Sequence, residues 1–212
     1  MKKYIAECIG TFALVFCGTG AATINEITNG AVSHVGVAVS FGLIVMAMIY
    51  TVGEISGAHL NPAVTIAFAI NKNFAWTEVV PYIVSQACGA FAASLILKFL
   101  FPTSIFLGAT LPLGSDTQSF VLEIILTFFL MFVILQVATG SKEQGMFAGL
   151  AIGSVVLLEA MFAGPICGAS MNPFRSLAPA VIGNHLEHLW IYLTAPFIGA
   201  LIAVVIYRII KT

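Results

Sequence analysis

The sequence has very few charged residues. Lys and Arg number 8 and Asp and Glu number 9 among 212 residues, so 8% of the chain is charged, against about 25% in a typical soluble domain. A soluble domain of this length would have too much surface to cover with so few charges. The composition also argues against a disordered or fibrous chain, because 60% of the residues are apolar. A membrane protein with several spans is the class that remains.

Basic runs and metal-type cysteine spacings are also missing. The formal net charge is −1, and without a basic run we expect no nucleic-acid partner. The four cysteines, Cys8, Cys17, Cys88 and Cys167, are not spaced as in a metal site. The sequence contains no evident nucleophile–base pair or phosphate-binding loop. We therefore expect no metal, no other cofactor and no enzymatic activity.

Six segments are long and apolar enough to cross a bilayer. A helix that spans ~30 Å of hydrocarbon needs about 20 mostly apolar residues. The segments lie at roughly 4–24, 31–53, 77–100, 118–139, 145–164 and 188–208. The first follows two lysines, as in a signal peptide, but it is too long for one and we expect it to be retained. Aromatic residues near span ends suit an interfacial belt: Trp76, Trp190, Tyr82 and Tyr192.

Two further apolar segments are too short to span. They run from Asn61 to about Asn71 and from Asn172 to about Gly183, and about eleven helical residues rise only about 16 Å. Each begins with Asn-Pro. Asn is a strong N-cap, and Pro fits the first helical turn, where its missing N–H is not needed. Both segments therefore predict half-helices that start at an Asn cap.

The basic residues lie mostly on one side of the predicted spans. If the spans alternate, six cations share a side: Lys2, Lys3, Lys72, Lys142, Arg208 and Lys211. The opposite connections, at about 25–30 and 101–117, contain no Lys or Arg. We therefore expect both termini on the cytoplasmic face of a plasma or inner membrane. Lys98, near the outer end of the third span, is the exception and could extend outward to the interface.

One motif occurs twice. The segment from Ile55 to Ala67 matches the segment from Ile166 to Ala178. Other pairs recur in the same order: Gly42 with Gly153, Gly89 with Gly199, and Glu7 with Glu123. Each half, 1–105 and 115–212, has three full spans, so the second half enters from the opposite side and the repeat is inverted. The predicted fold is an all-α membrane protein, one domain over 1–212, with six transmembrane helices and two half-helices.

In an inverted repeat the two Asn-capped N-termini meet near the midplane. Each carries unsatisfied N–H groups and about half a positive charge, which repels cations, while the Asn61 and Asn172 amides can donate to a neutral oxygen. The backbone before each Asn must be non-helical, which the membrane tolerates only where it is buried or lines a wet cavity. A pore for neutral, hydrogen-bonding solutes should then be lined by the backbone of Gly57, Ala58 and His59 and of Gly168, Ala169 and Ser170.

These two loops resemble the signature loops of the major intrinsic protein family, the aquaporins and aquaglyceroporins, and the resemblance covers essentially the whole chain. It implies a passive channel for water and small uncharged solutes that excludes ions and protons, and a homotetramer in the lipid bilayer with one pore per subunit. The first loop, with Asn61, Pro62 and Ala63, fits the family pattern. The second, with Asn172, Pro173 and Phe174, departs from it at Phe174, where Ala is usual. Phe174 either packs laterally or changes the pore width.

The resemblance also implies an outer constriction formed by Phe41, Ala160, Ala169 and Arg175. Arg175 suits this place on physical grounds, because its fork of donors is always charged and can bind a neutral oxygen. Strict water channels of the family carry His where this chain has Ala160, so we expect a wider, less polar constriction. The stretch before Asn172 is most similar to the nodulin-26-like branch, which carries water, glycerol-sized polyols, urea and uncharged metalloid hydroxides.

Three carboxylates fall inside predicted spans. The resemblance implies that Glu7 and Glu123 hold the signature loops by hydrogen bonds, and proton relay is the other interpretation. Glu159 could pair with Arg175, accept from loop backbone or face the pore. Other functions also stay open. An ion-coupled secondary transporter shares inverted repeats and broken helices and would use these carboxylates. A water-only channel would differ at the constriction. Phe174 is the one feature that points to a non-conducting adhesion or structural member of the same fold.

Overall fold

The computed structural model describes residues 1–211, without the side chains of residues 143 and 144. This part of the chain forms helices and loops and contains no strand. The helices are α1 (Lys2–Ile27), α2 (Ser33–Ser56), α3 (Pro62–Ile70), α4 (Trp76–Leu100), α5 (Asp116–Ala138), α6 (Lys142–Met146), α7 (Ala148–Cys167), α8 (Pro173–Gly183) and α9 (Leu189–Lys211). Six of them are long and apolar enough to cross a membrane. The predicted fold class is confirmed, and the short α6 is an element that the sequence analysis did not predict.

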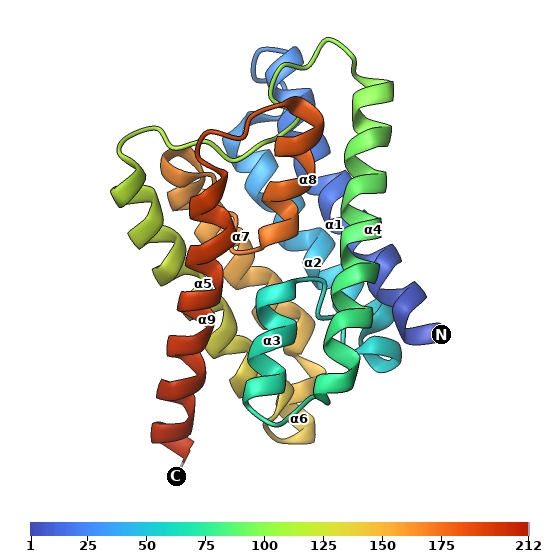
Figure 1. Cartoon of the computed structure of the whole chain (residues 1–212), viewed down its shortest axis with the longest axis vertical. Helices are drawn as coiled ribbons and strands as arrows, with labels where there is room; N and C mark the ends of the chain where they lie inside the picture. The colour runs from blue at the N-terminus through green and yellow to red at the C-terminus, as the bar shows by residue number, and fades with distance from the viewer. Residues whose placement is uncertain (212) are drawn as a thin grey trace.

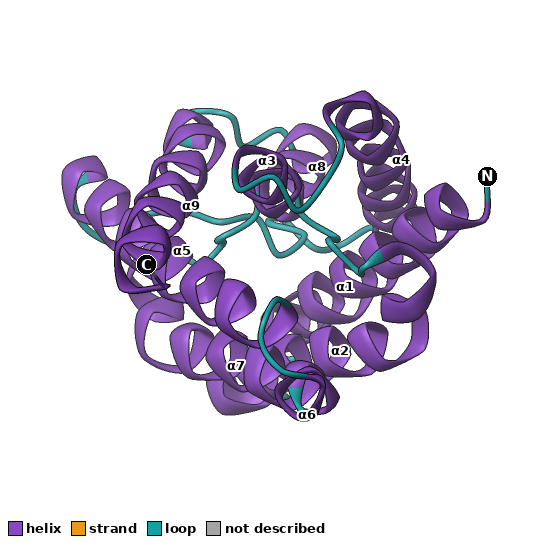
Figure 2. Ribbon diagram, turned by 90° about the horizontal axis from the view of Figure 1, so that it is seen from below, coloured by secondary structure: helices purple, strands orange, loops and turns teal. Residues whose placement is uncertain are grey.

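The two half-helices fill the gap that the six long helices leave between α4 and α9. Figure 1 shows α8 above α3, and the view from below in Figure 2 shows the two overlapping between α4 and α9. Among the long helices α1 packs against α2 and α4, α5 packs against α7 and α9, and α2 joins the two halves by packing against α7, while both half-helices contact α4 and α9. The bundle therefore holds two short helices end to end where a spanning helix would otherwise run.

Both half-helices begin as their Asn-Pro sequences predict. The Asn61 side-chain oxygen accepts from Ala63 N at 2.9 Å, and the Asn172 side-chain oxygen accepts from Phe174 N at 3.0 Å. A proline follows each Asn at the start of the helix. The Asn61 cap satisfies one and the Asn172 cap two of the N–H groups that a helix start leaves unpaired.

Two helix crossings, one in each half, bring backbones unusually close. A Cβ built on Gly89 of α4 would lie 2.2 Å from the carbonyl oxygen of Cys8 in α1. A Cβ built on Gly199 of α9 would lie 2.3 Å from the carbonyl oxygen of Ile124 in α5. Small residues at a crossing allow such tight packing between helices in a membrane. The contact between α1 and α4 therefore has a counterpart between α5 and α9.

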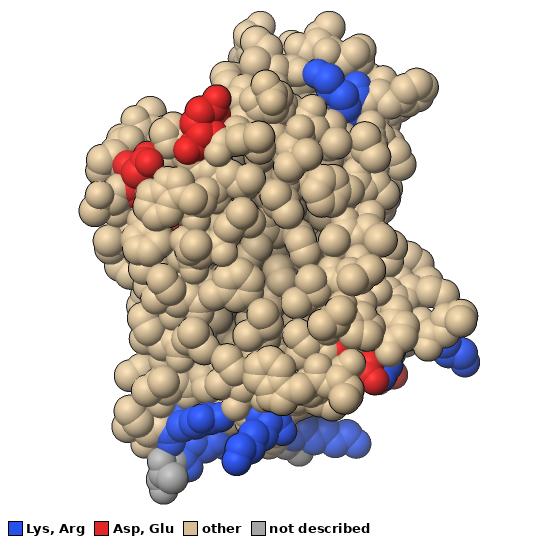
Figure 3. Space-filling model, in the orientation of Figure 1, with Lys and Arg blue, Asp and Glu red and all other residues tan. Residues whose placement is uncertain are grey.

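The bundle has one basic end. Figure 3 shows most of the Lys and Arg side chains gathered at the end of the molecule where Figure 1 marks the C-terminus. There Arg208 Nη2 donates to the Ile70 carbonyl at 2.5 Å and Arg208 Nε donates to Asn71 Oδ1 at 3.0 Å. Since Ile70 and Asn71 end the half-helix α3, a cation stabilises the negative end of its dipole.

Candidate functional site

The two half-helix caps are joined to each other by a reciprocal pair of hydrogen bonds. Asn61 Nδ2 donates to the Met171 carbonyl and Asn172 Nδ2 donates to the Leu60 carbonyl, both at 2.8 Å. Both asparagines are buried. Each amide has a second N–H, for which no protein acceptor is found in the described part of the chain. Asn61 and Asn172 line the same cavity, so this second donor is available to a solute there.

The loops that lead to the two caps share one backbone conformation. Left-handed φ angles occur at Gly57 (84°), Ala58 (48°) and Leu60 (51°), and again at Gly168 (85°), Ala169 (42°) and Met171 (54°). A non-glycine residue in this region costs on the order of 1–3 kcal/mol and persists only where its surroundings hold it. Gly57 and Gly168 end α2 and α7 in the conformation that glycine adopts without this cost.

Two buried glutamates hold these strained loops. The Glu7 carboxylate on α1 accepts from four donors: Ser56 Oγ, His59 N, Leu60 N and Gln86 Nε2, at 2.8–2.9 Å. The Glu123 carboxylate on α5 accepts from Ser170 N and Met171 N, both at 2.8 Å. Both glutamates are fully buried. Backbone N–H groups that the left-handed turns leave unpaired thus find charged or polar acceptors inside the bundle.

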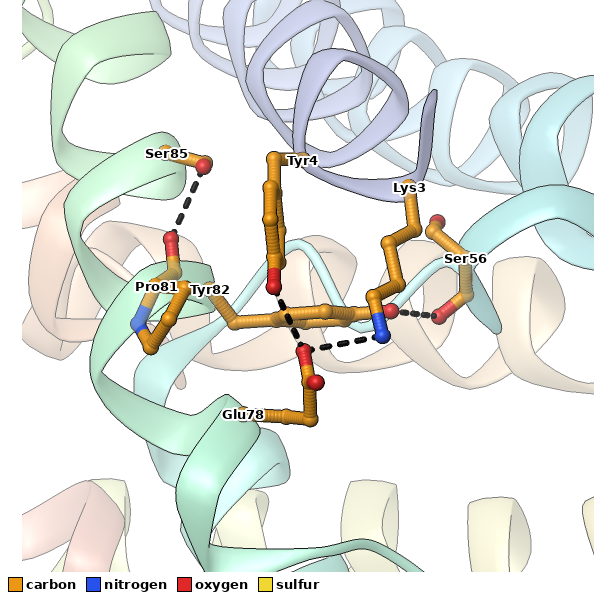
Figure 4. A network of polar contacts seen from close by, with 7 residues as sticks. All are labelled: Lys3, Tyr4, Ser56, Glu78, Pro81, Tyr82 and Ser85. Carbon is orange, nitrogen blue, oxygen red and sulfur yellow. Dashed lines mark hydrogen bonds and ion pairs between the residues drawn. The ribbon is translucent and has the colours of Figure 1, made fainter. Parts of the chain in front are cut away.

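Two tyrosines hold the carbonyls just before the loops. Tyr82 OH donates to the Ser56 carbonyl at 2.9 Å, and Tyr192 OH donates to the Cys167 carbonyl at 2.8 Å. Figure 4 shows the Tyr82 hydroxyl directed at Ser56, with Lys3 and Tyr4 converging on Glu78 beside it. The prediction of an interfacial position for these tyrosines was wrong, because both rings are buried. Tyr82 and Tyr192 occupy corresponding positions in the two repeat halves, and this correspondence is the sequence signal for a shared structural role.

His59 lies at the cavity and packs its ring against three aromatic rings. The residue lines the cavity that also contains the two asparagines. Its ring packs with the rings of Phe68, Phe74 and Tyr82 at centroid distances of 4.7–5.2 Å. The Nδ1 atom lies 3.2 Å from Thr65 Oγ1. The ring therefore anchors the first loop.

Two cavities follow one another along the bundle. The first, of about 110 Å³, is lined by both asparagines and by these predicted loop residues: Gly57, Ala58, His59, Ala169 and Ser170. The second, of about 160 Å³, lies beneath the loop between α4 and α5 and is lined by Gly168. The two linings share three residues, Phe41, Ala160 and Arg175. The boundary between the cavities therefore contains three of the four residues predicted for the constriction, and the fourth, Ala169, lines the first cavity.

Arg175 is fixed from two sides. Its Nη1 donates to the Gly108 carbonyl at 2.8 Å, and its Cζ lies 4.8 Å from the centre of the Phe41 ring, a distance that permits a cation–π contact. The side chain is 5% exposed, and Nε has no hydrogen-bond partner in the described part of the chain. Arg175 is thus held at the boundary between the cavities by one hydrogen bond and one ring contact.

Phe174 and Glu159 lie away from both cavities. Phe174 is partly buried, packs against the apolar core and is absent from both linings. Glu159 is 5% exposed and is also absent from them. None of the three expectations for Glu159 is met in the described part of the chain. It makes no ion pair with Arg175, accepts no loop N–H and does not line a cavity, and its Oε2 has no hydrogen-bond partner.

Comparisons with known proteins agree with this geometry. The family model described as major intrinsic protein matches residues 1–207. The chain is 50% identical over 212 residues to "Aquaporin NIP1-1" from Oryza sativa subsp. japonica, covering 100% of this chain and 75% of the relative. It is 46% identical over 213 residues to "Nodulin-26" from Glycine max, covering 100% and 78%. The X-ray structure of the aquaglyceroporin from Plasmodium falciparum is similar with a TM-score of 0.86 at 26% identity, covering 97% of this chain and 94% of that one.

Proposed function

This chain belongs to the major intrinsic protein family and is a channel for water and small neutral solutes; we propose that its pore also passes glycerol, urea and uncharged metalloid hydroxides while it excludes ions and protons. The observation that carries this proposal is the boundary between the two cavities, where the methyl group of Ala160 lies with the Phe41 ring and the Arg175 guanidinium. A methyl group leaves room that a larger, polar side chain would fill.

We assign the selectivity constriction to Phe41, Ala160, Ala169 and Arg175. In this assignment Arg175 donates to the oxygen of a passing solute, and the Phe41 ring contacts its carbon side. Ala160 and Ala169 set the width. Glycerol and urea have both an apolar and a hydrogen-bonding side, which suits such a lining. Solute hydrogen bonds are continued along the loop backbone and at the second N–H groups of Asn61 and Asn172.

Ion exclusion is supported by the charges that face the path. The two half-helix N-termini each contribute about half a positive charge. At an effective dielectric constant of ~20, each would repel a cation about 5 Å away by about 2 kcal/mol, and Arg175 adds a full charge. Among the described side chains, the linings of both cavities contain no Asp or Glu that would offset this barrier. The three carboxylates that an ion-coupled transporter would use here, Glu7, Glu123 and Glu159, line neither cavity, which speaks against that function.

The assembly and the orientation complete the proposal. We infer one channel domain over 1–212 with inverted halves at 1–105 and 115–212, supported by the matching loop conformations. We place both termini on the cytoplasmic side of a plasma or inner membrane, because the basic end of the bundle carries the termini of the chain. A homotetramer in the bilayer would cover part of the apolar outer surface, where Phe99 and Phe162 are strongly exposed.

Stopped-flow measurements on proteoliposomes test the solute range. The wild-type protein should raise water, glycerol and urea permeability above that of empty vesicles, with a low activation energy and no saturation. Ala160→His should retain water flux and lower glycerol and urea flux at least about tenfold, because a closer fit rejects a larger solute by ~1–3 kcal/mol. A wild-type protein that passes water but neither glycerol nor urea would refute the wide pore. Saturable, ion-dependent uptake would refute the passive channel.

A further inference from the structure

The loop between α4 and α5, residues 101–115, supplies the carbonyl that holds Arg175. Gly108 O accepts from Arg175 Nη1 at 2.8 Å. Gly108 has a left-handed φ of 69°, and a Cβ there would lie 2.7 Å from Thr19 Cβ on α1, so only glycine fits this position without strain. Because the carbonyl belongs to a loop rather than a helix, the position of the guanidinium depends on what holds the loop.

Glu26, in the last turn of α1, is the main anchor of this loop. Its Oε2 accepts from Ser104 Oγ and its Oε1 accepts from Ile105 N, both at 2.7 Å. Phe106 N lies 3.3–3.4 Å from the two oxygens. Short hydrogen bonds to a carboxylate are among the stronger ones in proteins. One carboxylate therefore collects three donors from consecutive residues of the loop.

Ser104 passes this anchoring toward Gly108. Its side chain is buried, and its Oγ accepts from Leu107 N at 3.0 Å while it donates to Glu26. On the other side, Lys98 Nζ donates to the Ser104 carbonyl at 3.5 Å. The lysine expected to extend outward from the end of α4 therefore contacts this loop. Ser104 is thus held between α1 and α4. Its hydroxyl also binds the backbone of Leu107, the residue before Gly108.

A second anchor follows Gly108. Thr110 Oγ1 donates to Ser176 Oγ at 2.8 Å, and Ser176 Oγ lies 2.5 Å from Ser170 Oγ in the second signature loop. Ser176 follows Arg175 directly on α8. The loop is therefore fixed on both sides of Gly108, by Glu26 before it and by Ser176 of α8 after it. We expect the Gly108 carbonyl to become more mobile when either contact is lost.

We propose that Glu26 is a positioning residue for the selectivity of this channel: acting through Ser104 and Gly108, it sets the position of the Arg175 guanidinium. This inference rests on the proposed function, in which Arg175 borders the constriction. Without the carboxylate, three donors of residues 104–106 turn to water and the Gly108 carbonyl moves with them. The guanidinium, then packed against the Phe41 ring alone, occupies a wider range of positions, and larger solutes pass more readily.

Permeability ratios in proteoliposomes test this inference. Glu26→Ala should raise the ratio of glycerol to water permeability at least about threefold, because the hydrogen bonds that hold three donors of the loop are lost. Ser104→Ala, a milder change, should act in the same direction. Glu26→Gln should stay near wild type, because its amide can accept from Ile105 N and donate to Ser104 Oγ. The matched control is Glu187→Ala, which removes an exposed carboxylate of another loop and should leave the ratio unchanged.

Two further measurements separate this inference from the proposed function. In an Arg175→Ala background, Glu26→Ala should have no further effect on the ratio; an equal effect there would overturn the inference. The rate at which phenylglyoxal modifies Arg175, followed by mass spectrometry, does not depend on conduction and should rise at least about threefold in Glu26→Ala. An unchanged rate would overturn the inference even if the channel conducts. A wild-type protein that passes no water would overturn the proposed function, while a raised modification rate would still support the anchoring by Glu26.

Discussion

Replacing either Glu7 or Glu123 by Gln should destabilise the protein by a similar amount. Glu7 accepts four hydrogen bonds and Glu123 accepts two. A glutamine keeps one acceptor oxygen and turns its NH₂ group toward the donors at the other. At position 7 one of the two donors there, the Ser56 hydroxyl or the Gln86 amide, can reorient to accept from the NH₂ group, so at either position one backbone N–H loses its acceptor. A buried donor that loses its acceptor costs about 1–3 kcal/mol. We therefore expect each variant to lower the free energy of unfolding by about 1–3 kcal/mol.

Denaturation of the purified protein in mixed micelles, followed by circular dichroism, measures these differences. Glu54→Gln is the matched control, since Glu54 is exposed near the end of α2 and should change the free energy by less than about 0.5 kcal/mol. The ranking of solutes should stay the same in both core variants, because neither glutamate lines a cavity. The reasoning fails if one core variant costs more than twice as much as the other, or if the control is as costly as either.

Two more substitutions address the residues that lie away from the cavities. Phe174→Ala should lower the thermal midpoint, since it removes a partly buried ring worth ~1–3 kcal/mol, but leave the glycerol-to-water ratio of proteoliposomes at the wild-type value; a changed ratio would mean that the ring controls the pore width. Glu159→Met should raise the thermal midpoint by several degrees, because it replaces a buried carboxyl that lacks partners with an apolar chain of similar size. A lower midpoint would show that Glu159 has a stabilising partner.

The helices were predictable from local pattern, and the contacts between distant loops were not. Apolar run length located all six spans, and the Asn-Pro pairs located both half-helices, because these signals depend on neighbours in the chain. The internal repeat singled out Glu7 and Glu123, because each stands at the same place in its half of the sequence. The bond between Arg175 and Gly108 spans 67 residues and joins a side chain to a loop carbonyl. A carbonyl occurs at every residue, so no residue type marks its partner.

The direction in which a helical side chain points was the other limit. Glu159 lies beside Ala160 in the sequence, and neighbours on a helix point about 100° apart. Ala160 lines both cavities, and Glu159 lines neither. Tyr82 and Tyr192 were misplaced for a similar reason, since nearness to a span end does not say whether a ring faces lipid or the bundle. Both questions depend on how the helices are rotated against one another, which only the packed structure shows.

The reciprocal bonds between the two caps join residues that are made far apart in time during synthesis of the chain. The partner of Asn61 lies 110 residues later, at Met171, and the partner of Asn172 lies 112 residues earlier, at Leu60. While the first half emerges from the ribosome, its cap therefore has no acceptor to bind. The junction of the two half-helices, which lines the first cavity, therefore forms only once both halves of the chain are in place.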